Sequence, residues 1–191
     1  MTMLALGACA QSEPTPATTS VPGSPSTTAG AGLSASLAAG GVIYRRIDKA
    51  CEVLDPAPLR EVFGEPGYQQ DEVRQVGTTA NMTCAMALGK SPGGAVVTLL
   101  ATVGGPASGH IMYEGLRGVQ QDSGPMSDIA GLGAGAYSYT DELTGTHVVV
   151  YDNNLYLTLG AAPLRPGAAM PGDLVDRLTR VASAALSGLH G

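Results

Sequence analysis

A long run of small and polar residues near the start of the chain limits most strongly what this sequence can fold into. From Ala10 to Gly40 the chain consists largely of Ser, Thr, Pro, Ala and Gly, and Glu13 is its only charged residue. Such a composition cannot bury enough apolar surface to offset the entropy lost on ordering. We therefore expect residues 9–43 to be a disordered tether and residues 44–191 to form a single domain, long enough to bury a hydrophobic core.

The residues just before this run are LGAC, from Leu6 to Cys9, and they resemble the lipobox of bacterial lipoproteins. In that class the cysteine becomes the new N-terminus and is acylated. The resemblance implies that residues 1–8 are the remnant of a signal peptide and that Cys9 carries the lipid. Export signals also begin with a basic segment, whereas this chain has no Lys or Arg before Arg45, so we expect the natural start codon to lie further upstream. The alternative is a free Cys9 thiol at a frayed terminus.

Charge and hydropathy bear on the partners of the chain. The net charge is −6 and the ten Lys and Arg residues are scattered, so a nucleic-acid backbone would meet mainly repulsion. No apolar run approaches the roughly 20 residues that a membrane-spanning helix needs. We therefore expect no nucleic-acid partner, and attachment to the membrane only through lipid on Cys9, with two or more acyl chains giving stable binding.

The remaining cysteines, Cys51 and Cys84, form an even pair if Cys9 is acylated. In an oxidising compartment the pair predicts a disulfide. In the cytosol two reduced thiols would be the alternative. Zinc would need about four ligands, and the three histidines show no ligand-like spacing with either cysteine, so we expect no metal site and no cofactor.

The periodicity of residues 44–191 predicts an α+β fold. Asp55 and Pro56 begin a short helix over 56–63, and MYEGLRGVQQ lies in a second helix over 107–121. Period-two alternation and turn residues predict about five antiparallel strands. These strands cover residues 81–89, 95–103, 136–140, 147–151 and 155–161. A long amphipathic helix over 172–189 ends the chain, with Arg177 on its water-facing side. We expect the helices to pack on one face of the sheet.

Several short motifs are typical of chemistry but are better explained as turns. GKSPG, from Gly89 to Gly93, fits the nucleophile elbow around Ser91, yet Pro92 has no N–H for an oxyanion and a strand follows. GLGAG, from Gly131 to Gly135, precedes a strand and not a helix. Adjacent carboxylates such as Asp71 and Glu72 usually mark solvated loops. We therefore predict no catalytic residue.

The segment from about residue 48 to the end is similar to a family of small secreted actinobacterial lipoproteins that carry a domain of unknown function. The matching stretches are ACEVLDPAPLREVFGEP, MTCAMAL, IAGLGAGAYSY, HVVVYDNNLYLTLGA and the final Ala- and Leu-rich helix. The chain differs in having Ala85 and Met86 where the family often has Trp, and in lacking two later cysteines. The extracellular sensor domain of mycobacterial receptor kinases is a related resemblance. Both imply a place outside the membrane and supply no catalytic residues.

Together these features predict a non-catalytic lipoprotein of the cell envelope, held on the extracytoplasmic face of the cell membrane by Cys9. Its domain is expected to bind an envelope protein or a small ligand. Two alternatives remain. One is a secreted hydrolase acting on envelope material, which would assemble its catalytic groups from distant residues. The other is an envelope lipid carrier with a greasy cavity.

Overall fold

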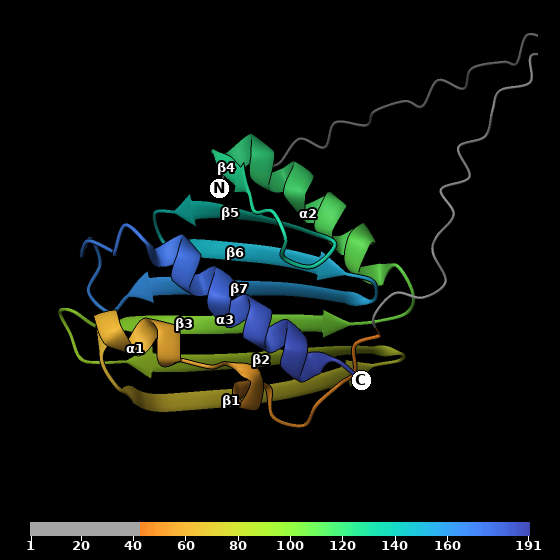
Figure 1. Ribbon diagram of the computed structural model, residues 1–191, viewed down its shortest axis with the longest axis horizontal. Helices are drawn as coiled ribbons and strands as arrows, with labels where there is room; N and C mark the ends of the chain where they lie inside the picture. Colours follow the sequence, from red (N-terminus) through yellow and green to blue (C-terminus); the bar gives the residue numbers. More distant parts are fainter. Residues whose placement is uncertain (1–42) are drawn as a thin grey trace, which may run out of the picture. The chain divides into compact units, whose positions relative to one another are not determined.

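The computed structural model describes residues 43–191, whose strands form one antiparallel sheet (Figure 1). The spatial order of the seven strands is β1-β2-β3-β7-β6-β5-β4. In chain order the elements are η1 (Ala50–Val53), α1 (Ala57–Phe63), β1 (Pro66–Val76), β2 (Thr79–Leu88), β3 (Ala95–Val103), α2 (Ser108–Ser123), β4 (Met126–Asp128), β5 (Gly135–Asp141), β6 (Gly145–Asp152), β7 (Leu155–Pro163) and α3 (Leu174–Leu189). The predicted signal remnant and all of the predicted tether except Ile43, including Cys9, lie outside the described residues.

The predicted α+β class, the antiparallel sheet and the C-terminal helix are confirmed, but the expected strand count of about five was too low. The two additional strands, β1 and β4, are the two edges of the sheet. β1 was missed because ten of its eleven residues are exposed, so its sequence shows no apolar alternation. β4 has only three residues, which is too short to give a pattern.

The first face of the sheet packs against η1, α1 and α3 and forms the main core. Its side chains alternate along the strands, as Met82, Cys84, Met86 and Leu88 do on β2. α3 crosses this face (Figure 1) and presents a stripe of buried residues. The stripe consists of Leu174, Leu178, Val181, Ala182, Ala185 and Leu189. This regular 3.6-residue spacing explains why the terminal helix could be predicted from the sequence.

The second face of the sheet carries α2, so the expectation that all helices pack on one face was wrong. Tyr113 of α2 packs with Tyr137, Val149 and Tyr156 of the sheet, whereas Val148, the neighbour of Val149, belongs to the core on the first face. Adjacent residues of a strand point to opposite faces. The continuous apolar run in β6 is therefore the signature of a strand covered on both faces, which a single-face interpretation overlooked.

The helix α1 begins close to the predicted position, after Asp55. In α3 the predicted water-facing position of Arg177 is not confirmed. The Asp55 carboxylate accepts a hydrogen bond from the Ala57 N–H at 2.9 Å, which satisfies an otherwise free amide of the first turn. Arg177 was expected to face solvent, but its side chain is only 13% exposed. It donates to the Pro58 carbonyl at 2.7 Å and pairs with Glu61 of α1 at 2.9 Å, so it joins the two helices.

The segment before η1 is attached to the turn between β6 and β7 by a buried asparagine. The Asn154 side chain accepts from the Tyr44 N–H and donates to the Tyr44 carbonyl, both at 2.9 Å. The Tyr44 hydroxyl donates to Asp152 at 2.8 Å. Gly191 also donates its N–H to the Ile43 carbonyl at 3.0 Å. The two ends of the described chain are therefore paired with each other.

Candidate functional site

Tyrosines gather between α2 and the second face of the sheet. Five of the seven tyrosines of the chain lie in this layer, one on α2 and four on the sheet. They are Tyr113, Tyr137, Tyr139, Tyr151 and Tyr156. The Tyr113 ring lies between two others, with centroid distances of 5.2 Å to Tyr137 and 4.5 Å to Tyr151. Tilted ring pairs at these distances add to the stability that burial alone gives.

Arg117 closes this layer at its solvent side. Its guanidinium donates to the Tyr113 hydroxyl at 2.8 Å and pairs with Asp128 of β4 at 2.7 Å. It also lies 5.5 Å from the centre of the Tyr137 ring, a cation–π distance. Burial raises the pKa of Tyr113, which Arg117 partly opposes, and burial raises the pKa of Tyr137 strongly. Both phenols are therefore neutral at neutral pH and cannot act as bases there.

His147 of β6 is a buried titratable group on this face. Its ring stacks on Tyr139 at 4.7 Å with an interplanar angle of 14°. Its Nε2 atom lies 2.9 Å from the Thr144 hydroxyl. That hydroxyl in turn donates to the Asp141 carboxylate, also at 2.9 Å. Asp141, Thr144 and His147 thus form one hydrogen-bonded chain in the β5–β6 hairpin.

The protonation state of His147 follows from these hydrogen bonds. A hydroxyl has one hydrogen, and Thr144 gives its hydrogen to Asp141, so Thr144 must accept from an N–H on Nε2. The proton then resides on Nε2, and Nδ1 is left with a free lone pair. Burial lowers the pKa of His147, opposed by the charge of Asp141. Hydrogen bonds from the Thr144 amide, the Thr144 hydroxyl and the Leu143 amide lower the pKa of Asp141, which is therefore ionised.

The free Nδ1 of His147 is enclosed by the sheet. It is buried and has no hydrogen-bond partner. His147 pairs with Gly160 of β7, and a Cβ atom at Gly160 would lie 2.8 Å from Nδ1 and 3.1 Å from the Thr98 hydroxyl. The imidazole therefore occupies the space that a side chain at residue 160 would take. A substrate cannot reach this lone pair while the ring lies against β7.

The second face is covered by α2 only in part. Beyond the helix, four partly or fully exposed side chains of β2 and β3 and one of β7 form a surface that we call the open face. It consists of Thr83, Ala85, Thr98, Leu100 and Thr158. The Leu100 residue is 41% exposed although it occupies a central strand. β2, β3 and β7 contain no charged residue, so the open face is uncharged and carries three threonine hydroxyls. Glu72 of β1, which pairs with Thr83, lies at its edge.

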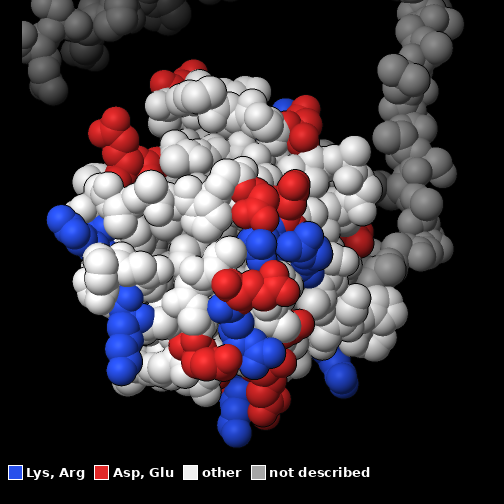
Figure 2. All heavy atoms as spheres, turned by 60° about the vertical axis from the view of Figure 1, so that its left-hand side comes forward, with Lys and Arg blue, Asp and Glu red and all other residues white. Residues whose placement is uncertain are grey.

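A band of charged side chains lies on another side of the molecule. Figure 2 shows Lys and Arg side chains interleaved with Asp and Glu in one mixed band on the side of the molecule that lies at the left of Figure 1. Ion pairs at the contact of α1 and α3 belong to this side, among them the pair of Arg177 with Glu61. A shallow depression of about 390 Å³ there is lined by Ala57, Arg60, Glu61 and Glu65. Because both signs alternate, this band has no strong net field for a charged ligand.

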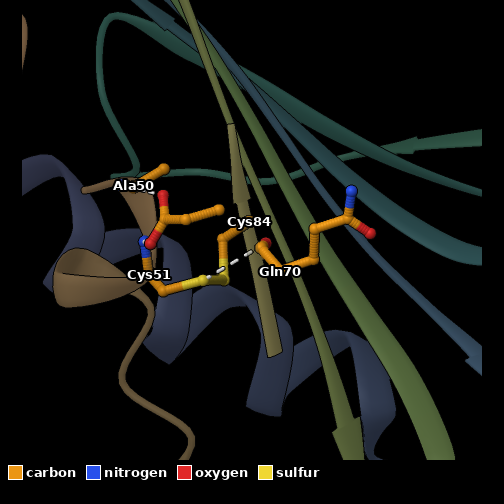
Figure 3. The surroundings of a disulfide bond; sticks show 5 residues. Ala50, Cys51, Gln70 and Cys84 are labelled. Carbon is orange, nitrogen blue, oxygen red and sulfur yellow. Dashed lines mark hydrogen bonds between the residues drawn. A yellow bond between two sulfur atoms is a disulfide. The ribbon is translucent and has the colours of Figure 1, made fainter. Parts of the chain in front are cut away.

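The predicted disulfide between Cys51 and Cys84 is present, with an S–S distance of 2.07 Å (Figure 3). It joins η1 to β2 across the first face of the sheet. The Asp71 carboxylate accepts from the backbone N–H groups of Ala50 and Cys51 at 2.6 and 3.1 Å. The Cys51 sulfur lies 3.5 Å from the Gln70 carbonyl, which is a packing contact because a bridged sulfur carries no hydrogen. Asp71 therefore lies in a strand and fixes η1, contrary to the expectation of a solvated loop.

The GKSPG and GLGAG motifs lie in turns and bends, as the sequence predicts. Ser91 lies in the β2–β3 connection and is followed by a cis peptide bond to Pro92. Gly131 and Gly133 have positive φ angles in the bend that leads into β5. His110 and His147 contact different tyrosines, Tyr151 and Tyr139 respectively. Apart from the five-residue hairpin connection, no pattern in the sequence indicates the hydrogen-bonded chain of Asp141, Thr144 and His147.

Residues 43–191 contain no group of three His, Cys, Asp or Glu side chains that could hold a metal ion. No helix in this part of the chain is long and apolar enough to span a membrane. Comparisons with protein-family models, with curated proteins and with solved structures found no match to the chain. The function must therefore be inferred from the chain itself.

Proposed function

We propose that this protein is a lipid-anchored lipoprotein of the cell envelope whose domain is a non-catalytic binding module. Its place outside the cytoplasm is supported by the disulfide between Cys51 and Cys84, because such bonds persist in oxidising compartments. The LGAC sequence ending at Cys9 supports acylation of that cysteine. The resemblance to secreted actinobacterial lipoproteins agrees with both features.

The observation that carries the binding role is the open face. A sheet that is covered by helices on its first face leaves uncharged, partly apolar side chains exposed on the second, with Leu100 and Thr98 at its centre. Leucine in a central strand is normally buried, and clustered exposed apolar side chains are typical of interaction surfaces. We infer that an uncharged surface of an envelope protein or ligand contacts these strands.

The geometry of His147 supports a binding role over hydrolysis. A general base needs a lone pair within reach of the proton that it removes. The Nδ1 lone pair of His147 is enclosed against Gly160, and its Nε2 proton is held by Thr144. The Asp141, Thr144 and His147 chain thus stabilises the β5–β6 hairpin. The alternative of a secreted hydrolase predicts that His147→Gln abolishes an activity on envelope material, whereas a binding module keeps its function.

The location can be tested by metabolic labelling in the native host. Radiolabelled palmitate should enter the wild-type protein and should not enter a Cys9→Ala variant. Export can be scored separately by whether Cys51 and Cys84 are bridged in material taken from cells under thiol-blocking conditions. Absence of label in wild type, together with free thiols at both positions, would contradict the proposed location.

The binding surface can be tested with a photo-crosslinking amino acid placed at Leu100. The matched control carries the same amino acid at Ser183, an exposed position of α3 on the other side of the molecule. We expect one reproducible crosslinked species from position 100 and none of the same mass from position 183. The crosslink should weaken in a Thr98→Arg background, which adds a charge to the open face. Equal labelling from both positions would argue against this surface.

A further inference from the structure

The two edges of the sheet differ in length and accessibility. β4 forms one edge and has three residues, whereas β1 forms the other edge and has eleven. Figure 1 shows β1 along the lower edge of the sheet. Every β1 residue except Val73 is exposed, and within residues 43–191 only β2 pairs with it. Such an edge is a template for another strand.

The β1–β2 hairpin determines which backbone groups of β1 point outward. Val76 pairs with Thr79 across the two-residue turn Gly77–Thr78, so these two residues share the hydrogen bond that closes the turn. Hydrogen-bonded pairs alternate with pairs that are not bonded along an antiparallel ladder. The N–H and C=O groups of Gln75, Val73 and Asp71 therefore point away from β2, toward the free edge.

A second copy can use these groups only in a few registers. Two copies related by a two-fold axis pair antiparallel, and outward-pointing residues must lie opposite outward-pointing residues. Successive permitted registers therefore differ by a shift of the two-fold axis along β1 by one residue. Axes at residues 71, 72 and 74 place Asp71, Glu72 or Arg74 opposite its own copy, which brings like charges together. An axis at residue 75 centres on Gln75 and pairs no opposite charges.

The axis at Val73 is the register in which opposite charges meet. Glu72 then lies opposite Arg74 of the second copy, and Arg74 lies opposite Glu72 of the second copy. Both are pairs without mutual backbone hydrogen bonds, in which side chains approach most closely. In the single chain the Arg74 guanidinium already contacts the Glu72 carboxylate. We propose that β1 pairs with β1 of a second copy in this register, so that the ion pair is exchanged between the copies.

The side chains on the first face do not oppose this pairing. The Asp71 carboxylate is engaged by the Ala50 and Cys51 amides, and the Gln75 side chain accepts from Arg46 at 2.7 Å. Val73 is partly buried against the main core. A contact made by one strand from each copy is smaller than a standard interface of about 800 Å² per partner. The dimer is therefore weak and its population depends on concentration.

Sedimentation equilibrium of the full chain tests the proposal, with Cys9→Ser as the background so that residue 9 cannot link two copies. We expect a monomer–dimer equilibrium. Arg74→Glu and Glu72→Arg should each raise the dissociation constant at least tenfold, because each places like charges opposite each other. The double variant Glu72→Arg/Arg74→Glu should restore the original value. Glu114→Arg, on α2, makes the same change of charge as Glu72→Arg and should leave the dissociation constant unchanged.

Two further variants separate edge pairing from charge effects. Gln75→Pro removes an N–H that points away from β2, so it should abolish the dimer and keep the monomer folded, as checked by circular dichroism. Val73→Cys should form an interchain disulfide, because hydrogen-bonded antiparallel pairs have Cα atoms about 5.5 Å apart. Val76→Cys is more exposed and should not. A monomer at every concentration up to about 1 mM, or single reversals without effect, would overturn the proposal.

Discussion

The two faces of the sheet are built from the same strands but differ in how completely helices cover them. On β3, Leu99 is fully buried in the main core, whereas its neighbour Leu100 is 41% exposed on the open face. The first face is a continuous layer of Leu, Val, Met and Ala under α3. The second face carries tyrosines, His147 and threonines, and α2 covers it only in part. The stability of this domain therefore comes mainly from the first face.

The largest effect should come from the same substitution made on each face. Leu99→Ala leaves a cavity in the main core and should lower the free energy of unfolding by about 2–5 kcal/mol. Leu100→Ala removes a half-exposed side chain and should cost less than about 1 kcal/mol. Urea unfolding followed by circular dichroism measures both. Equal losses at the two positions would show that the open face is covered in solution.

The second-largest loss of unfolding free energy should come from removing the disulfide, which lies on the first face. Replacing both partners, as Cys51→Ala/Cys84→Ala, should lower the free energy of unfolding by about 2–4 kcal/mol. Reductant should destabilise the wild-type protein by a similar amount and leave the double variant unchanged. A wild type that is insensitive to reductant under unfolding conditions would mean that the bridge contributes little.

A smaller effect is expected where His147 lies over β7. Gly160→Ala places a methyl group 2.8 Å from Nδ1 of His147, and this overpacking should cost about 1–3 kcal/mol. In a His147→Ala background the same change should cost less, since the ring is absent. The control is Gly172→Ala, whose methyl group would meet open space. If Gly160→Ala costs the same in both backgrounds, the clash with the ring is not its cause.

The smallest expected effect is a dependence of the free energy of unfolding on pH, which arises from His147 on the second face. The pKa of His147 is lowered in the folded protein from its ordinary value of 6.5 because the ring is buried. The unfolded chain therefore takes up this proton more readily, and stability should fall as the pH drops below about 6.5 and level off below the folded pKa. The lowered pKa of Asp141 acts in a separate window, since its contribution is lost as the pH falls below about 4.

Urea midpoints between pH 7.5 and 5 measure this dependence. His147→Phe keeps an aromatic ring on Tyr139 but cannot titrate, so the decline between pH 7 and 5 should flatten. The control is Ser183→Phe, which places a phenyl ring at an exposed position of α3 and should leave the decline in place. A profile that persists in His147→Phe would assign the pH dependence to another group.

The elements that the sequence predicted are those whose burial is periodic. α3 has one apolar stripe and β2 alternates strictly, so local spacing alone identifies them. β1 gives no such signal, because ten of its eleven residues are exposed and an edge strand of this kind needs few apolar residues. The single-face prediction failed because β6 is covered on both sides, and the spacing of its valines cannot tell which helix covers which side.

The candidate site was less accessible to prediction than the fold. The pairing of Cys51 with Cys84 followed from an even count of cysteines after Cys9 is set aside. The contact of His147 with Gly160 depends on the pairing of β6 with β7, and the role of Asp71 depends on η1 lying over β1. The residues that make these contacts are distant in the sequence, and no local pattern around them indicates the contact. The acylation of Cys9 stays a prediction.

The backbone hydrogen bond between Ile43 and Gly191 places the first and last described residues next to each other. Ile43 and Gly191 therefore lie at the same end of the sheet. Asn154 holds this end through its hydrogen bonds to Tyr44. A force that pulls these two ends apart would act first on the backbone hydrogen bonds that join residues 43–45 to residues 189–191. A domain fused after Gly191 would therefore lie beside Ile43, and the opposite end of the sheet would stay unobstructed.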